Sequence, residues 1–432
     1  MLYHSTNHNS PIVNFKEATI KGQAPDKGLY FPESIPQVSE IFINNIDKLS
    51  KEEIAYTVIQ PYIGDVIPKN ELERIVAETI NFEFPLVKVE ENIFSLELFH
   101  GPTLAFKDVG ARFMSRCLGY FVKDQNKKIT VLVATSGDTG GAVANGFYDV
   151  EGVDVVILYP SGKVSSVQEL QLTTLEKNIT ALEVDGTFDD CQALVKKAFT
   201  DDEINKKLFL TSANSINVAR WLPQQFYYFF AYQQWKDKDH FPVISVPSGN
   251  FGNICAGILA HRSGLPVQHF IAACNANDIV PSYMQTEKYT TKKSVATISN
   301  AMDVGDPSNF IRILEIFNRE FISLKKVLTS YSISDEETRS VLKDVFLNKN
   351  YLLDPHGAVG YVALKKYLQI HPDLQGIFLE TAHPVKFYDV VEPIIEQAVP
   401  MPSAIKDLLK EKKKSIKMNV DYASFKEFLL AK

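Results

Sequence analysis

The chain has 432 residues, of which 45% are apolar and 22% are charged, and this ordinary globular composition excludes disorder, collagen and coiled coil as descriptions of the whole chain. The 45 Lys and Arg residues stand against 52 Asp and Glu residues, so the formal net charge of −7 disfavours nonspecific binding to a nucleic-acid backbone. At roughly 150 residues per domain, the length predicts about three domains, or two with elaborations.

Short β-branched runs alternate with segments of helical period from about residue 128 onward. This alternation predicts an α/β fold with parallel sheets that are covered by helices on both faces. We predict strands at residues 129–134, 153–159, 181–184, 208–210, 243–246, 267–274 and 377–379, and helices at 108–119, 141–150, 189–199, 254–261 and 356–370, with an aromatic helix that ends at Trp235.

Two polar stretches interrupt this pattern in the second half of the chain. The lysine-rich residues 406–417 are predicted to form a solvated amphipathic helix rather than a nucleic-acid contact. The residues 285–293 are polar and are expected to form a mobile loop.

The cysteines and the N-terminus indicate an intracellular protein. No CxxC motif occurs, so we expect buried, reduced thiols rather than a zinc site or a redox pair. The first 11 residues hold no apolar core and no basic run, which disfavours a signal peptide. The longest apolar block, 226–232, is much shorter than the roughly 20 residues that span a bilayer. The four single cysteines are Cys117, Cys191, Cys255 and Cys274.

Parallel sheets bind ligands at the carboxyl ends of their strands, so the loops that follow the predicted strands are the places to look for chemistry. In residues 247–253 (PSGNFGN), two glycines allow close approach of the backbone, and the following helix directs free N–H groups to the same point. This pattern suits a phosphate, although a plain tight turn would give the same sequence. Neither GxGxxG nor GxxxxGK[ST] is present, which disfavours a dinucleotide or P-loop site.

Three other loops carry polar side chains. Residues 135–141 (TSGDTGG) gather hydroxyls and glycines at a helix start and suit a carboxylate or a second phosphate, with an N-cap at Ser136 or Asp138 as the alternative. Asn214, Ser215 and Arg220 could clamp an anion, although this segment taken alone favours capping and a surface arginine. Thr381 could bind a ring nitrogen of a cofactor or cap a helix.

Several anion sites without metal or dinucleotide motifs point to a cofactor that carries its own phosphate and reacts through a lysine. Pyridoxal phosphate (PLP) fits, because it needs a phosphate cradle, a Schiff-base lysine and a partner for its ring nitrogen. Lys107 is the candidate, since it lies among apolar residues at a helix start, although a snorkelling lysine has the same surroundings. The histidines that lack metal-ligand spacing, and are therefore expected to be structural, are His100, His356 and His383.

At this point the sequence resembles the threonine synthase family of fold-type-II PLP enzymes, the tryptophan synthase β-like group. Two residues depart from the family pattern: Lys27 stands where a glycine is common, and Gly357 stands where a threonine is frequent. The segments that carry the resemblance are residues 3–6 (YHST), 24–32 (APDKGLYFP), 99–108 (FHGPTLAFKD), 135–140 (TSGDTG), 214–220 (NSINVAR), 248–253 (SGNFGN), 354–360 (DPHGAVG) and 381–386 (TAHPVK).

The resemblance implies a role for each candidate residue. Lys107 would bind PLP and later shuttle protons, Thr381 would bind the pyridine nitrogen, and Asp138 would lie near the cofactor. The cofactor phosphate would be held by Gly249, Asn250, Phe251, Gly252 and Asn253. The substrate carboxylate and phosphate would be bound by Thr135, Ser136, Thr139, Asn214, Ser215 and Arg220.

The implied reaction converts O-phospho-L-homoserine and water to L-threonine and phosphate, without a metal. A phospho-lyase that yields 2-oxobutyrate and a non-catalytic ligand-binding relative remain alternatives. We expect a cytoplasmic monomer or homodimer that binds neither membrane nor nucleic acid. The expected domains are an N-terminal helical portion (1–90), a lobe with the Schiff-base lysine (91–225), a larger lobe with the phosphate loop (226–400) and a helical tail (401–432).

Overall fold

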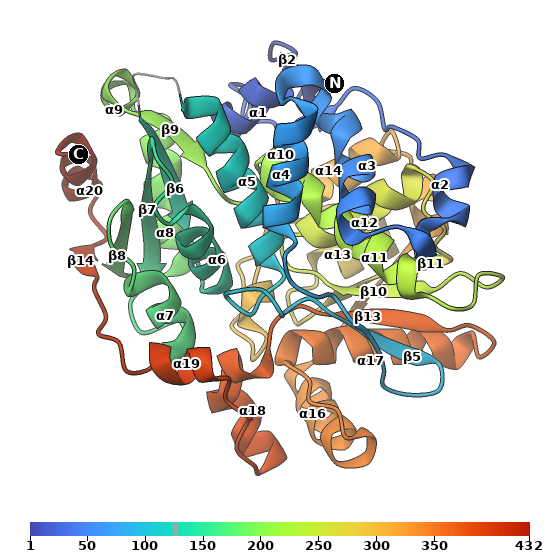
Figure 1. Ribbon diagram of the computed structural model, residues 1–432. Helices are drawn as coiled ribbons and strands as arrows, with labels where there is room; N and C mark the ends of the chain where they lie inside the picture. The colour runs from blue at the N-terminus through green and yellow to red at the C-terminus, as the bar shows by residue number, and fades with distance from the viewer. Residues whose placement is uncertain (124–127) are drawn as a thin grey trace. The chain divides into compact units, whose positions relative to one another are not determined.

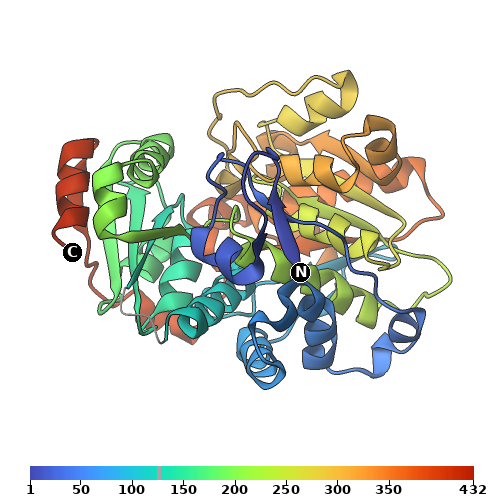
Figure 2. The same cartoon turned by 90° about the horizontal axis from the view of Figure 1, so that it is seen from above.

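A computed structural model describes residues 1–123 and 128–432, and the chain folds into two compact units. The first unit contains Met1 and residues 31–106 and 221–400, and the second contains residues 2–30, 107–220 and 401–432. Each unit is therefore assembled from separated segments, whereas the division expected from the sequence follows continuous ones. Figures 1 and 2 trace the elements in chain order by colour.

The first unit is built on a six-stranded sheet in the order β12-β11-β10-β13-β5-β4. Neighbouring strands are parallel except at one edge, where β4 runs antiparallel to β5. The pairing Phe378↔Ser95 shows that β5, from early in the chain, joins strands from its second half. The strands are β4 (Leu86–Lys88), β5 (Ile93–Glu97), β10 (Val243–Pro247), β11 (His269–Cys274), β12 (Leu328–Ser332) and β13 (Gly376–Glu380).

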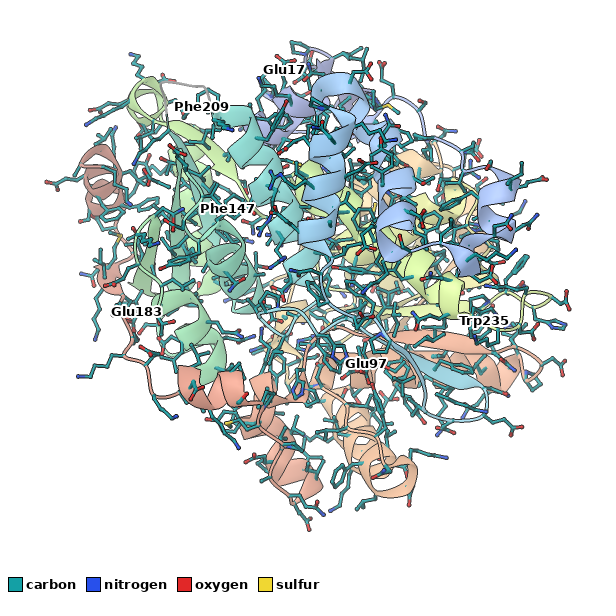
Figure 3. The ribbon with its side chains drawn as sticks, in the orientation of Figure 1. Glu17, Glu97, Phe147, Glu183, Phe209 and Trp235 are labelled. Atoms are coloured by element: carbon teal, nitrogen blue, oxygen red, sulfur yellow. The ribbon has the colours of Figure 1, made fainter. Side chains whose placement is uncertain are left out.

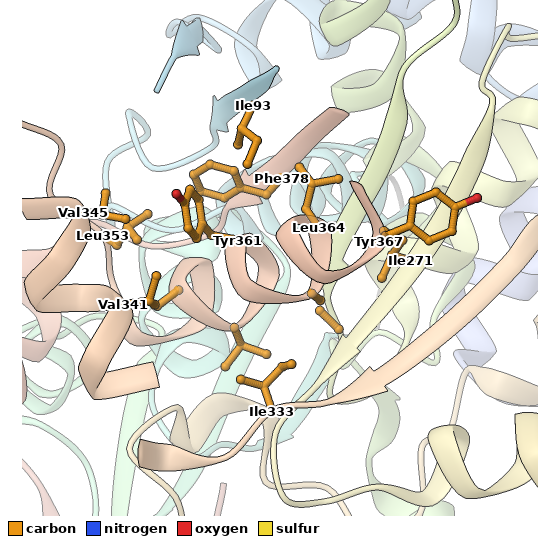
Figure 4. Packing of buried hydrophobic residues seen from close by; sticks show 14 of the residues in the cluster. Ile93, Ile271, Ile333, Val341, Val345, Leu353, Tyr361, Leu364, Tyr367 and Phe378 are labelled. Atoms are coloured by element: carbon orange, nitrogen blue, oxygen red, sulfur yellow. The ribbon is translucent and has the colours of Figure 1, made fainter. Parts of the chain in front are cut away.

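The helices of this unit include α17, which packs on β10, β11 and β13. Its side chains Tyr361 and Leu364 meet Ile271 and Phe378 of the sheet in one apolar cluster (Figure 4). The helices are α2 (Glu40–Asn44), α3 (Lys51–Ile63), α4 (Lys69–Thr79), α11 (Gln225–Gln234), α12 (Gly252–Arg262), α13 (Ile279–Thr286), α14 (Phe310–Ile316), α15 (Phe321–Val327), α16 (Asp335–Lys349), α17 (Pro355–Ile370) and α18 (Tyr388–Ile395), with short 3-10 turns η1 (Ile46–Lys48), η2 (Gly64–Val66), η3 (Leu222–Gln224), η4 (Asn300–Met302) and η5 (Pro384–Phe387).

The second unit has an all-parallel five-stranded sheet in the order β14-β8-β7-β6-β9. Leu132 and Leu158 pack with α8, while their neighbours Val131 and Ile157 are equally buried on the other face. Burial on both faces explains the continuous apolar runs from which these strands were predicted. The strands are β6 (Ile129–Ala134), β7 (Val153–Pro160), β8 (Ile179–Asp185), β9 (Phe209–Ser212) and β14 (Ile416–Asn419).

The helices of the second unit alternate with its strands, and the N-terminal strands β1 and β2 pair antiparallel. Two elements cross the limits between the units, namely β3 (Tyr30–Pro32) and α10 (Val218–Trp221). The remaining elements are β1 (Leu2–Ser5), β2 (Val13–Asn14), α1 (Phe15–Lys21), α5 (Lys107–Val122), α6 (Asp138–Phe147), α7 (Ser166–Thr173), α8 (Phe188–Phe199), α9 (Asp202–Lys207), α19 (Ser403–Leu408) and α20 (Tyr422–Leu430).

The predicted α/β class, its parallel sheets and the helical N-terminal portion are confirmed, and each predicted strand is present. The prediction of a helix over residues 406–417 is wrong, because α19 ends at Leu408 and β14 begins at Ile416. Lys413 explains the extended path, since its ammonium pairs with Glu169 at 2.6 Å and with Glu183 on β8 at 2.8 Å. Figure 3 labels Glu183, against which this lysine-rich segment is anchored.

The four cysteines are free and buried, as predicted. Burial raises the pKa of Cys191, Cys255 and Cys274 to about 12. Among the helices of the described residues, none combines the length and apolar character that crossing a bilayer requires.

Lys27 adopts a left-handed backbone with φ of 68°, a conformation that favours glycine. This conformation costs a non-glycine residue about 1–2 kcal/mol, whereas glycine loses about 0.5–1 kcal/mol through chain entropy. We therefore expect Lys27→Gly to raise the unfolding free energy by about 0.5–1 kcal/mol. Thermal unfolding tests this, with Lys206→Gly inside α9 as a control that should destabilise, and a lower midpoint for Lys27→Gly would contradict it.

Candidate active site

The loop after β10 carries the glycines that were predicted to bind a phosphate. Its ends are fixed by side chains, since Asn253 Nδ2 donates to the carbonyl of Pro247 at 2.8 Å and Tyr228 Oη donates to the carbonyl of Asn253 at 2.8 Å. Phe251 has a left-handed φ of 62° immediately before α12 begins at Gly252. The first N–H groups of a helix have no intrahelical partner, so this turn presents a site for an anion.

A second segment, residues 300–309, buttresses the phosphate loop and was not found from the sequence. The N–H of Ser308 donates to Asn250 Oδ1 at 2.7 Å, and the N–H of Asn309 donates to the Asn250 carbonyl at 3.2 Å. Arg312 Nη1 in turn donates to Asn309 Oδ1 at 2.7 Å. These residues lie about 60 positions from the loop that they hold, and no local pattern announces such a contact.

Gly249 shows that the loop has no room for a side chain. A Cβ at this position would lie 2.7 Å from Met302 Cα and 3.2 Å from the carbonyl oxygen of Ala301. Both neighbours are backbone atoms, so the loop itself would have to move. The residues present therefore fit a phosphate held by main-chain groups at close range.

We expect Gly249→Ala to weaken PLP binding by about 5–150-fold, because overpacking of this kind costs about 1–3 kcal/mol. Titration of the cofactor-free protein, followed by the absorbance of the cofactor, measures the change. Gly119→Ala is the control, since a Cβ there would meet only the flexible side chain of Val150 at 3.2 Å. Unchanged affinity in Gly249→Ala would show that the loop does not hold the cofactor phosphate.

Thr381 follows β13, the sheet neighbour of β10, and lies beside the segment that leads to Lys107. The carbonyl of Thr381 accepts from the N–H of Phe106 at 2.9 Å, and the N–H of His383 donates to the carbonyl of Leu104 at 3.0 Å. Lys386, fully buried, donates through Nζ to the carbonyl of Thr103 at 2.8 Å. The hydroxyl of Tyr227 also bonds to the Phe106 carbonyl. The residue before Lys107 is thus fixed next to Thr381.

Lys107 itself is the first residue of α5, one turn before Gly110. Gly110 lies against Arg220, since a Cβ at 110 would be 2.6 Å from the Arg220 carbonyl oxygen and 3.2 Å from its Nε. The Arg220 side chain is 2% exposed, and its Nη1 donates to the carbonyl of Ala213 at 2.7 Å. The arginine is therefore a built-in part of this unit, close to the first turn of α5, and no longer fits the alternative of a surface residue.

The loop after β6 is shaped by Thr135. Its Oγ1 accepts from the N–H groups of Gly137 at 3.0 Å and Gly140 at 2.9 Å. The N-cap of α6 is Gly137, so the alternative of a cap at Ser136 or Asp138 is wrong. The hydroxyl of Thr135, directly after β6, thus supplies the acceptor for free N–H groups at the start of α6.

Asp138 has a partner that the sequence analysis missed. Its Oδ1 accepts from Gln168 Nε2 at 2.9 Å, and Gln168 also forms a capping box with Ser165 at the start of α7. The S-x-x-Q spacing of that box was visible in the sequence and could have identified this helix start. Thr139 is the second residue of α6, so the polar residues 135–139 lie together at its N-terminal end.

The loop after β9 joins the one after β6. Asn214 Nδ2 donates to the Ala134 carbonyl at 3.2 Å, which links the ends of the two adjacent strands. The turn is organised by Asn217 rather than by Asn214 or Ser215, because Asn217 Oδ1 accepts from Ala219 N–H at 3.0 Å and its Nδ2 donates to the Thr19 carbonyl at 2.9 Å. Ser215 lies within this turn.

The predicted site residues form two groups. The first unit holds Gly249, Asn250, Phe251, Gly252, Asn253 and Thr381 at the carboxyl ends of adjacent strands. The second unit contains Lys107, Thr135, Ser136, Asp138, Thr139, Asn214, Ser215 and Arg220. Their roles toward cofactor and substrate remain predictions.

The histidines in question have structural partners. His100 Nε2 contacts Glu97 Oε2 at 2.7 Å, and His383 Nδ1 accepts from the N–H of Val385 at 3.0 Å. Burial, and then the neighbouring His100, lower the pKa of His383 to about 4, so this imidazole is neutral. The cap of the η5 turn is His383, so Thr381 is not the N-cap that the sequence allowed.

Comparison with known proteins identifies the family. Residues 82–376 match the family described as "Pyridoxal-phosphate dependent enzyme", residues 2–80 match "Threonine synthase N terminus" and residues 357–429 match "Threonine synthase, C-terminal". The chain belongs to the threonine synthase family of pyridoxal-phosphate-dependent enzymes. The resemblance and the cofactor predicted from the sequence are thereby confirmed.

Relatives match over the full length. Threonine synthase from Haemophilus influenzae is 45% identical over 431 residues, which cover 100% of both chains. The crystal structure of threonine synthase from Escherichia coli has a TM-score of 0.94 at 41% identity and covers 100% of both chains. A PLP-bound threonine synthase from Brucella melitensis has a TM-score of 0.93 at 34% identity and covers 100% of this chain and 99% of that one.

Proposed function

We propose that this chain is a threonine synthase that converts O-phospho-L-homoserine and water into L-threonine and phosphate. The observation that carries the proposal is the fixed segment before Lys107, which runs beside Thr381 at the strand end next to the phosphate loop. A hydroxyl and an anion cradle at neighbouring strand ends, with a segment that leads to a lysine beside them, are the kinds of group that PLP needs, and this supports the proposal. The proposal makes the enzyme a carbon–oxygen lyase that acts on phosphates.

The cofactor, when bound, supplies an electron sink that stabilises negative charge on substrate carbons. Lys107 would be the residue that holds the cofactor, and its amine would then move protons at Cα, Cβ and Cγ of the substrate. The Thr381 hydroxyl hydrogen-bonds the ring nitrogen without charging it. Residues 249–253 hold its phosphate through backbone N–H groups.

The substrate is held by the second group of residues. Arg220, with Asn214 and Ser215, binds the substrate phosphate and stabilises the dianion that departs from Cγ. Thr135, Ser136 and Thr139 bind the substrate carboxylate at the start of α6. Water then adds its oxygen at Cβ, and a proton goes to Cγ, which balances the overall conversion.

Product analysis tests the proposal. Purified protein with PLP is incubated with O-phospho-L-homoserine, and threonine, phosphate and 2-oxobutyrate are quantified, with phosphoserine and phosphothreonine in parallel. We expect threonine and phosphate in equal amounts. A dominant yield of 2-oxobutyrate would assign the chain to a phospho-lyase instead, and no turnover of any of the three would contradict catalysis.

The cellular setting and the organisation of the chain complete the proposal. We place the enzyme in the cytoplasm, as a monomer or homodimer that acts on a small molecule and on neither nucleic acid nor membrane. The net charge of −7 disfavours a nucleic-acid partner. We keep, as a proposed functional division of the chain, the segments 1–90, 91–225, 226–400 and 401–432. Size-exclusion chromatography with light scattering measures the oligomeric state directly.

A further inference from the structure

Two acidic side chains lie completely buried behind Thr381. Glu380 is the last residue of β13, Asp354 caps the N-terminus of α17, and both are 0% exposed. The backbone N–H of Asp354 donates to Glu380 Oε1 at 2.5 Å. A strand end and a helix start that are 26 positions apart in the chain thus meet through these residues.

Asp354 extends the contact toward the phosphate loop. Its Oδ1 accepts from the backbone N–H of His356 at 2.6 Å and from His356 Nδ1 at 2.5 Å. His356 Nε2 accepts from the N–H of Ala301 at 3.2 Å. Ala301 and Met302 are the residues whose backbone packs against Gly249.

The second oxygen of each carboxyl group is buried without a partner among the residues that the structure describes, namely Asp354 Oδ2 and Glu380 Oε2. Two adjacent ionised carboxylates in a buried position are strongly disfavoured, whereas one shared proton satisfies both oxygens. Burial, and then the neighbouring Asp354, raise the pKa of Glu380 well above its usual range. Asp354 Oδ1 already accepts the two hydrogen bonds from His356, so we assign the proton to Glu380.

Gly357 makes space for this pair. A Cβ at Gly357 would lie 1.5 Å from Glu380 Oε2, so any side chain there would displace the glutamate. A side chain at position 357 is therefore incompatible with Glu380 in this position, so the glycine and the glutamate depend on each other.

We propose that Glu380 carries a proton that it shares with Asp354, and that this neutral-plus-charged carboxyl pair positions both Thr381 and the Ala301–Met302 backbone behind Gly249. Glu380 directly precedes Thr381, and Asp354 reaches Ala301 through His356, so one hydrogen-bonded network holds both contacts that are proposed for the cofactor. The positioning role rests on the proposed function of Thr381 and Gly249, whereas the shared proton does not.

The shared proton also limits the charge near Thr381. The other titratable groups that face the pair are Glu97, Tyr351 and His383, and Asp303 faces His356. Glu97 is hydrogen-bonded to Tyr351 Oη at 2.9 Å and to His100. A second ionised carboxylate beside Asp354 would favour protonation of a ring nitrogen bound at Thr381, which a neutral Glu380 avoids.

Glu380→Gln tests the proton directly, because glutamine copies the shape and donor of a protonated glutamate. Above the usual pKa of glutamate, the folded chain holds a proton that the unfolded chain has lost, so this residue makes stability fall as the pH rises toward its raised pKa. Glutamine removes this dependence. We therefore expect the full-length, PLP-loaded Glu380→Gln variant to unfold at least about 2 °C above the unsubstituted protein at neutral pH.

A pH series and a control variant test how the difference in unfolding temperature changes with pH. The gap in unfolding temperature between Glu380→Gln and the unsubstituted protein should widen from about pH 5 to about pH 8. Glu83→Gln is the matched control, since Glu83 is exposed and pairs with Lys51 at 2.8 Å, and it should show no widening gap. A gap that stays constant or narrows would show an ionised Glu380 and overturn the shared proton.

Infrared difference spectra between these proteins provide a second measurement that does not depend on unfolding. The unsubstituted protein should show the carbonyl stretch of a protonated carboxyl group at neutral pH, and this band should be absent in Glu380→Gln. Identical spectra in this region would overturn the proposal.

The positioning role has its own readout. PLP affinity should stay within about 3-fold in Glu380→Gln and fall at least about 10-fold in Glu380→Ala and Gly357→Ala, which disturb the pair from its two sides. If the pH and infrared results hold but both disruptive variants bind PLP normally, the pair does not position the cofactor contacts, and that half of the proposal is overturned. The product analysis above is unaffected by either result.

Discussion

Replacing Lys107 by alanine is expected to abolish covalent attachment of PLP and to lower the rate of threonine formation by at least about 1000-fold. The loss follows from position, because the segment before this lysine is fixed beside Thr381 by backbone hydrogen bonds and by Lys386. Turnover of O-phospho-L-homoserine and retention of PLP on dialysis measure the two effects.

Lys123→Ala is the control for this experiment, since Lys123 is an exposed residue just after the same helix. It should keep both the bound cofactor and the activity. A Lys107→Ala protein that still forms threonine at a comparable rate would place the catalytic amine elsewhere in the chain.

Replacing Arg220 by leucine is expected to lower kcat/KM for O-phospho-L-homoserine by about 100–1000-fold, because a lost charge-assisted anion contact at a reacting centre costs this much. Leucine retains part of the apolar bulk against Gly110, so the effect should come mainly from the lost guanidinium. Steady-state kinetics across a range of substrate concentrations provide the measurement.

Two controls separate phosphate binding from damage to the fold. Arg74→Leu removes an exposed arginine of α4 and should leave kcat/KM unchanged. Binding of L-threonine, which has no phosphate, should be altered by less than about 3-fold in Arg220→Leu, as judged from the absorbance of the cofactor. Equal losses for both ligands would mean that Arg220 supports the fold and does not select the phosphate.

The ends of the predicted strands could be placed well from the sequence. Strands that are buried on both faces have continuous β-branched runs, such as residues 129–134. The loops that follow them could then be identified as candidate sites. The roles of side chains within the loops were harder to assign. Several polar side chains in each loop could accept a hydrogen bond from the backbone of the turn, and only the folded structure shows which one does. Thr135, Asn217 and His383 have that role, and the residues considered from the sequence do not.

Contacts between segments that are distant in the chain could not be predicted from local sequence patterns. Gln168 meets Asp138 and Arg312 reaches Asn250 through Asn309 only after the fold is formed. The strand β14 was missed for a related reason, because Lys413 in the segment that suggested a solvated helix pairs with Glu169 and Glu183, which are far away in the chain. The pairing of Gly357 with Glu380 likewise became visible only when both were placed in space.

Borohydride trapping of the unsubstituted protein tests the central claim most directly. The PLP-loaded enzyme is reduced, digested and mapped by mass spectrometry, so that the residue carrying the reduced cofactor is identified. We predict a single labelled peptide that contains Lys107. A label on any other lysine, Lys386 included, or no label at all, would contradict the assignment of this site.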